Sequence, residues 1–146
     1  MVETRIEKID LKKTNLLREF INSCGNSKDS FRYFNTRPLD IISNHVLTIL
    51  AFNDSVPVGY GHLDKEGDKI WFGIAVAENY KGKGIGKKVM QYLIEYADNN
   101  KILELHLSVD SDNVIAVNMY NKFNFFEVKN LSLGTVLMKR KNNNEI

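Results

Sequence analysis

Apolar residues recur at every fourth position between residues 85 and 97 of this chain, where Ile85, Val89, Leu93 and Ala97 form one stripe. Such spacing predicts an amphipathic helix with one face in a core. From residue 102 to 109 apolar and polar residues alternate instead. This second pattern predicts a strand whose apolar face is buried.

Three β-branched and apolar segments precede this helix and are separated by short polar turns. They span residues 46–52, 58–64 and 69–77. Turns this short predict an antiparallel meander. The last of these strands, the helix and the alternating strand form a β-α-β unit, so strands 69–77 and 102–109 are expected to be parallel.

The flanking segments follow from the same signals. Before the meander we expect a helix over residues 12–22 that stops near Gly25, and then an irregular helical region over 26–45. After the alternating strand we expect a helix over 114–123, capped by Asp112 or Asn113. The other expected elements are an opening strand over 5–9, closing strands over 125–129 and 134–139, and a polar, frayed tail over 141–146. The predicted fold class is therefore α+β, with a mixed sheet that is antiparallel at first and has a parallel pair at its centre.

The composition is that of an ordinary globular domain. Hydrophobic residues make up 43% and charged residues 26% of the 146 residues, so we expect one domain over residues 1–146. Twenty basic residues against 18 acidic ones give no basic footprint for nucleic acid. No apolar run reaches the ~18–20 residues that a membrane span needs. The single cysteine, Cys24, cannot form an internal disulfide, which favours a reducing, cytoplasmic location.

Three glycines at alternate positions, Gly82, Gly84 and Gly86, stand between the third meander strand and the helix, among several lysines. Without Cβ atoms, their backbone N–H groups can approach an anion closely, and the helix dipole adds a favourable potential for phosphate. The loop is not a dinucleotide fingerprint, because Lys87 stands where the third glycine belongs. It is not a P-loop either, because Lys88 stands where serine or threonine belongs.

Two stretches resemble the signatures of the GNAT superfamily of N-acetyltransferases. Lys81-Gly82-Lys83-Gly84-Ile85-Gly86 resembles the signature Arg/Gln-x-x-Gly-x-Gly/Ala. Residues 113–125 resemble the signature Asn-x-x-Ala-x-x-Leu/Met-Tyr-x-x-x-Gly-Phe. Lys81 departs from the first signature but keeps a positive charge, and Asn124 replaces a glycine but tolerates a left-handed backbone.

The resemblance implies that acetyl-CoA lies between two splayed parallel strands, as co-substrate. Ile74 and Val76 would offer backbone groups to its acetyl and pantetheine portions, and Asn113 would contact it while it also caps a helix. The residues implied to hold its pyrophosphate are Lys81, Gly82, Lys83, Gly84, Ile85, Gly86 and Lys87. Tyr120 matches the tyrosine that often protonates the departing thiolate in this family, although a core residue fits the same position.

The general base stays open. Ser108 stands where some relatives carry a glutamate, His62 and His106 lie on strands, and deprotonation through ordered water is equally compatible with the sequence. No metal site is expected, because the histidines and Cys24 show no ligand spacing.

The resemblance implies acetylation of a primary amine of a small molecule, such as an amino sugar, a polyamine or an amino-acid derivative. The residues expected to touch this acceptor are Phe31, Arg32, Tyr33 and His62, although Phe31 also fits a core helix face. Trp71 fits either the core or the pocket wall. The alternatives are acetylation of protein N-termini or lysines, and a non-catalytic acyl-CoA sensor. A monomer or a homodimer is expected, without nucleic-acid or membrane partners.

Overall fold

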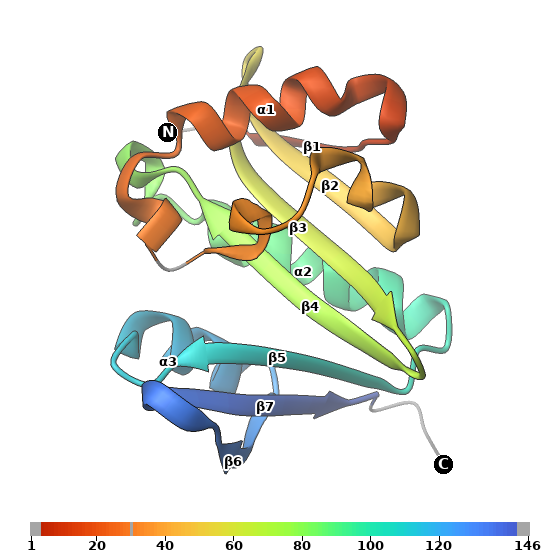
Figure 1. Ribbon diagram of the computed structural model, residues 1–146, viewed down its shortest axis with the longest axis vertical. Helices are drawn as coiled ribbons and strands as arrows, with labels where there is room; N and C mark the ends of the chain where they lie inside the picture. The colour runs from red at the N-terminus through yellow and green to blue at the C-terminus, as the bar shows by residue number, and fades with distance from the viewer. Residues whose placement is uncertain (1–3, 30, 143–146) are drawn as a thin grey trace.

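A seven-stranded mixed sheet forms the centre of the computed structural model, which describes residues 4–29 and 31–142 (Figure 1). The strands lie in the order β1-β2-β3-β4-β5-β7-β6. All neighbouring strands are antiparallel except β4 and β5, which are parallel, so the predicted meander, the parallel pair and the fold class are confirmed. The strands are β1 (Thr4–Lys8), β2 (His45–Asn53), β3 (Val56–Glu66), β4 (Lys69–Val76), β5 (Glu104–Asp110), β6 (Phe126–Asn130) and β7 (Thr135–Lys141).

The parallel pair is splayed. Strands β4 and β5 are joined only at Trp71 and His106, whereas β3 and β4 pair along their whole shared length. Beyond that pair the two strands diverge toward their C-terminal ends (Figure 1). The second half of β4 therefore has no strand neighbour on the side that faces β5.

Helices cover both faces of the sheet. Helix α2 (Ile85–Asn99) packs its apolar stripe on one face, and all four residues that define the stripe are buried, as predicted. Its close approach depends on Gly61 in β3, where an added Cβ would lie 2.7 Å from Val89 Cγ1. Helix α1 (Thr14–Ser23) covers the other face and buries Leu17 and Phe20.

The segment between α1 and β2 forms short 3₁₀ helices, which agrees with the irregular helical region predicted there. These are η2 (Gly25–Asp29), η3 (Tyr33–Asn35) and η4 (Leu39–Asn44). Three further 3₁₀ helices lie elsewhere in the chain: η1 (Leu11–Lys13), η5 (Glu78–Tyr80) and η6 (Ser132–Gly134). In Figure 1, η2 to η4 lie on the same side of the sheet as α1 and leave β5 uncovered.

Helix α3 (Val114–Lys122) begins at Asn113, whose side chain accepts a hydrogen bond from Ala116 N at 3.3 Å, so Asn113 and not Asp112 is the cap. Asn124 has a φ of 72°, which is the left-handed backbone expected in place of glycine. The predicted tail is wrong at its start, because Lys141 still pairs with Glu104 in the sheet, and residues 143–146 lie outside the described residues. Over residues 4–29 and 31–142, no helix is long and apolar enough to cross a membrane.

Candidate active site

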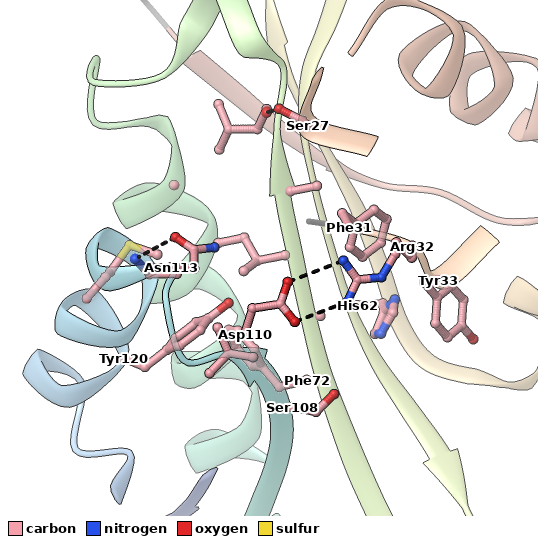
Figure 2. Close-up of a pocket in the computed structure, with 18 of the residues that line it drawn as sticks. Ser27, Phe31, Arg32, Tyr33, His62, Phe72, Ser108, Asp110, Asn113 and Tyr120 are labelled. Atoms are coloured by element: carbon pink, nitrogen blue, oxygen red, sulfur yellow. Dashed lines mark hydrogen bonds and ion pairs between the residues drawn. The ribbon is translucent and has the colours of Figure 1, made fainter. Parts of the chain in front are cut away.

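A cavity of about 820 Å³ opens where β4 and β5 diverge (Figure 2). This volume suits a small-molecule or cofactor site. All but two of the residues predicted to form the site line it, although they come from segments far apart in the sequence. They are Phe31, Arg32, Tyr33, His62, Ile74, Val76, Lys81, Gly82, Gly84, Gly86, Lys87, Asn113 and Tyr120.

The two exceptions are Lys83 and Ile85, which do not line the cavity. Lys83 is exposed, and Ile85 is only 1% exposed because it starts the apolar stripe of α2 and points into the core. The side chains of Lys83 and Ile85 therefore do not reach the cavity, and a part for these two residues in holding the pyrophosphate stays a prediction. The backbone of Ile85 can still contribute, because the first N–H groups of a helix have no intrahelical partner.

The glycine loop is shaped by its backbone. Gly82 and Gly84 have φ values of 78° and 83°, which disfavour other residues, and a Cβ on either would meet no atom within 4 Å. Gly84 is the N-cap of α2, so the free N–H groups of the first helical turn open onto the same cavity as the loop. Lys81 and Lys87 line it too. This is an electropositive cradle suited to phosphate.

Tyr120 lies on α3 with its ring buried and its hydroxyl directed toward the cavity (Figure 2). The ring meets Phe72 edge-on at 6.1 Å and lies 5.7 Å from the Phe125 ring. Its hydroxyl has no hydrogen-bond partner among the described residues. Burial raises the pKa of Tyr120 above its ordinary value, so the hydroxyl stays protonated at neutral pH and can donate.

The other end of the cavity holds a buried polar chain that begins at Asp64. The Tyr33 hydroxyl donates to Asp64 Oδ2 at 2.8 Å and lies 2.7 Å from His45 Nε2. His45 Nδ1 lies 2.8 Å from Thr48 Oγ1. Burial lowers the pKa of His45, so the ring is neutral: Nε2 donates to Tyr33, and Nδ1 accepts from Thr48.

An ion pair crosses the cavity above β4 (Figure 2). Arg32 donates from Nη1 to Asp110 Oδ2 at 3.2 Å and from Nη2 to Asp110 Oδ1 at 3.1 Å. This contact joins the loop before η3 to the C-terminal end of β5. Asp110 is not among the residues that the sequence predicts for the site, although the alternation of β5 puts it on the same face as Ser108.

The geometry decides where the Trp71 and His106 side chains lie relative to the cavity. Trp71 lines the cavity, so it belongs to the pocket wall, whereas His106 lies behind it at a ring distance of 5.6 Å and does not line the cavity. His106 is therefore not placed to deprotonate an acceptor there, while Ser108 does line the cavity. Within residues 4–29 and 31–142, no group of three or more histidine, cysteine or acidic residues is arranged to hold a metal ion.

Comparison with known proteins gives consistent matches. A family model described as the acetyltransferase (GNAT) family matches residues 14–125. Two relatives come from Bacillus subtilis (strain 168). The uncharacterized N-acetyltransferase YobR is 39% identical over 71 residues, covering 49% of this chain and 26% of that protein. Spermine/spermidine N(1)-acetyltransferase is 33% identical over 64 residues, covering 42% of each chain.

A solved structure supports the fold over nearly the whole chain. PaiA N-acetyltransferase from Thermoplasma acidophilum, in complex with coenzyme A, superposes with a TM-score of 0.77 at 19% identity, covering 95% of this chain and 99% of that chain. The matches to the two Bacillus proteins span less than half of the length of either. The family model spans most of the chain and includes both signatures. This protein therefore belongs to the acetyltransferase (GNAT) family.

Proposed function

We propose that this protein transfers the acetyl group of acetyl-CoA directly to a primary amine of a small molecule, with Tyr120 as the general acid. Its family makes it an acetyl-CoA-dependent acyltransferase. One observation carries the proposal: the glycine cradle, the unpaired half of β4 and the Tyr120 hydroxyl line a single cavity. These groups match the successive parts of a nucleotide-linked thioester, which are its phosphates, its extended arm and its sulfur.

Acetyl-CoA is proposed to lie along this cavity with its pyrophosphate on the glycine cradle. Gly82, Gly84, Gly86 and the N-terminal N–H groups of α2 would bind the phosphates, with Lys81 and Lys87 adding positive charge. The pantetheine arm would pair with the backbone at Ile74 and Val76 as an added strand. Asn113 would contact the cofactor beside its own helix cap. The coenzyme A held by the PaiA protein supports this donor.

The proposed reaction has one transfer step. The nitrogen of a neutral amine attacks the thioester carbonyl carbon, an N–C bond forms, and the C–S bond breaks. Tyr120 gives its proton to the departing thiolate and regains one from solvent. The proton lost by the amine leaves through water in the cavity.

A small cationic amine is the acceptor that the far end of the cavity supports best. Asp64, Glu66 and Asp110 line that end beside Arg32 and Arg37, which pair with Asp110 and Glu66. A cationic amine would take the place of an arginine on these carboxylates. The activity named for the Bacillus spermine/spermidine N(1)-acetyltransferase points to the same class. One domain over residues 1–146, a cytoplasmic location and a monomeric or homodimeric state remain predictions.

The test is a panel of amines assayed by release of free CoA thiol. Diamines and polyamines, amino sugars, amino-acid amides and a peptide with a free N-terminus cover the acceptor classes. If turnover is highest on small diamines, the proposal is supported. If turnover is highest on the peptide, protein acetylation is favoured instead. Saturable acetyl-CoA binding without turnover on any amine would identify an acyl-CoA sensor.

A further inference from the structure

We propose that His62 donates a hydrogen bond from Nε2 to the thioester carbonyl oxygen of acetyl-CoA, and that Tyr60 fixes the ring in the state that can donate. This inference rests on the proposed function. It assigns to a side chain of β3 a contact with the reacting carbonyl, whereas the sequence left His62 as an acceptor contact or a base.

The proton position on His62 follows from its buried partner. Tyr60 is 0% exposed, and its hydroxyl lies 2.6 Å from His62 Nδ1, its single partner among the described residues. A buried hydroxyl without an acceptor is costly, so Tyr60 donates and Nδ1 accepts. Burial, together with His45 and Arg37, lowers the pKa of His62 well below its ordinary value. The ring is thus neutral and carries its one proton on Nε2.

The His62 ring extends from β3 over the neighbouring strand β4, toward the edge of β4 that diverges from β5. His62 pairs with Gly73, and neighbouring strands lie ~4.8 Å apart. An ideal Cβ on Gly73 would overlap the imidazole, with Nε2 as the nearest atom. Glycine at this position therefore lets the ring lie over β4. Nε2 has no hydrogen-bond partner among the described residues, and His62 lines the cavity.

The groups around the ring keep it in place and uncharged. Tyr33 lies 4.4 Å and His45 4.7 Å from the His62 ring centroid, and Phe31 lies 6.3 Å away. Tyr33 is held by Asp64, so this wall is itself hydrogen-bonded. A hydrogen-bond donor that is held by such packing is already oriented, so little free energy is spent on reorienting it when negative charge develops opposite it.

A neutral N–H donor suits one task in this reaction. As the amine nitrogen bonds to the carbonyl carbon, the carbonyl oxygen gains negative charge, and a fixed donor stabilises that oxygen before the C–S bond breaks. No proton leaves His62, because the hydrogen bond is kept throughout. Since Nε2 carries a proton, its lone pair is not available to the amine, and His62 is not the general base.

The experiment compares His62→Leu, which removes the donor, with His62→Gln, which keeps an N–H at similar reach. His106→Leu is the matched control, because His106 is also a buried histidine on the same face of the sheet but does not line the cavity. Each protein is assayed for kcat on the best amine of the panel, for affinity toward CoA, which lacks the thioester carbonyl, and for its melting curve. The carbonyl band of bound [1-¹³C]acetyl-CoA is measured by isotope-edited infrared difference spectroscopy.

We expect His62→Leu to lower kcat by about 10²–10³-fold with CoA affinity nearly unchanged. His62→Gln should stay within about tenfold of the parent, and the control should match the parent. The carbonyl band should move to higher frequency in His62→Leu alone, because a hydrogen bond lowers that frequency. Turnover of His62→Leu within about tenfold of the parent, together with an unshifted band, would overturn the inference. If no amine is turned over but the band shifts, the donor contact stands and the proposed function fails.

Discussion

Replacing Tyr120 by phenylalanine separates the chemistry of this side chain from its packing. The hydroxyl has no hydrogen-bond partner among the described residues, so its removal leaves no buried group unpaired, and the free energy of unfolding should change by less than about 1 kcal/mol. A hydrogen bond to a charged group contributes about 1.5–3 kcal/mol. At about 1.36 kcal/mol per tenfold in rate, loss of the bond to the departing thiolate lowers kcat by roughly 10- to 150-fold.

Complete proton transfer would raise that factor to about 10²–10⁴. A tyrosine hydroxyl has a higher pKa than a thiol, and burial raises the pKa of Tyr120 further, so the hydrogen bond sets the lower bound and full transfer the upper one. The assay is kcat at saturating acetyl-CoA and amine, with a melting curve and an acetyl-CoA titration for each protein. Tyr96→Phe is the control, because Tyr96 is a tyrosine of α2 whose ring contacts Lys8 of β1 and does not line the cavity. A stable Tyr120→Phe protein with turnover within about twofold of the parent would refute the acid role.

Three further predictions follow from the geometry. Gly84→Asp and its uncharged control Gly84→Asn should both lower the melting temperature slightly, because a φ of 83° strains any side chain, although Asp and Asn tolerate it best. Only the aspartate should also weaken acetyl-CoA binding, about tenfold or more, by repelling phosphate, and equal titration curves for both variants would contradict the cradle. Arg32→Gln should lower the KM for a diamine by releasing Asp110, whereas Asp110→Asn should raise it; the reverse signs would assign the acceptor to the arginine. Burial lowers the pKa of all three histidines, so below their ordinary pKa the unfolded chain binds more protons than the folded one. The free energy of unfolding should therefore be constant with respect to these histidines above about pH 7, and it should fall by up to about 1.4 kcal/mol per pH unit per histidine below pH ~6.5. Thermal melts between about pH 7.5 and 5 measure this, and a flat curve would show that the rings are charged in the folded state.

The central part of the fold could be predicted because its signals are local. The stripe of α2 and the alternation of β5 reflect burial on one face, and a helix between two strands dictates their parallel pairing. The loop at Gly82 and Gly84 could be predicted as well, because positive φ values favour glycine and both positions have them. For Ile85 the signature leaves open whether the backbone or the side chain contributes, and the structure buries the side chain in the core.

The acceptor end could be predicted only in part, because its contacts join distant segments. Arg32 meets Asp110 across 78 positions of the chain, and the loop that carries Arg32 has no periodicity to fix its direction. The link between Tyr60 and His62 is only two residues long, yet its meaning depends on Gly73 in the next strand. A sequence shows that such residues share a face, but not that a neighbouring strand leaves room for one ring.

The splay of β4 and β5 needs support, because two adjacent strands with free backbone groups would otherwise pair along their length. The Tyr120, Phe72 and Phe125 rings pack together near the splay: Phe72 belongs to β4, Phe125 precedes β6, and Tyr120 reaches them from α3, with ring centroids 5.3 to 6.1 Å apart. Tyr120 therefore contributes a ring that packs in the core beside the cavity and a hydroxyl that faces into the cavity. Because only the hydroxyl differs between tyrosine and phenylalanine, that single substitution distinguishes these two contributions, whereas a smaller residue would remove both together.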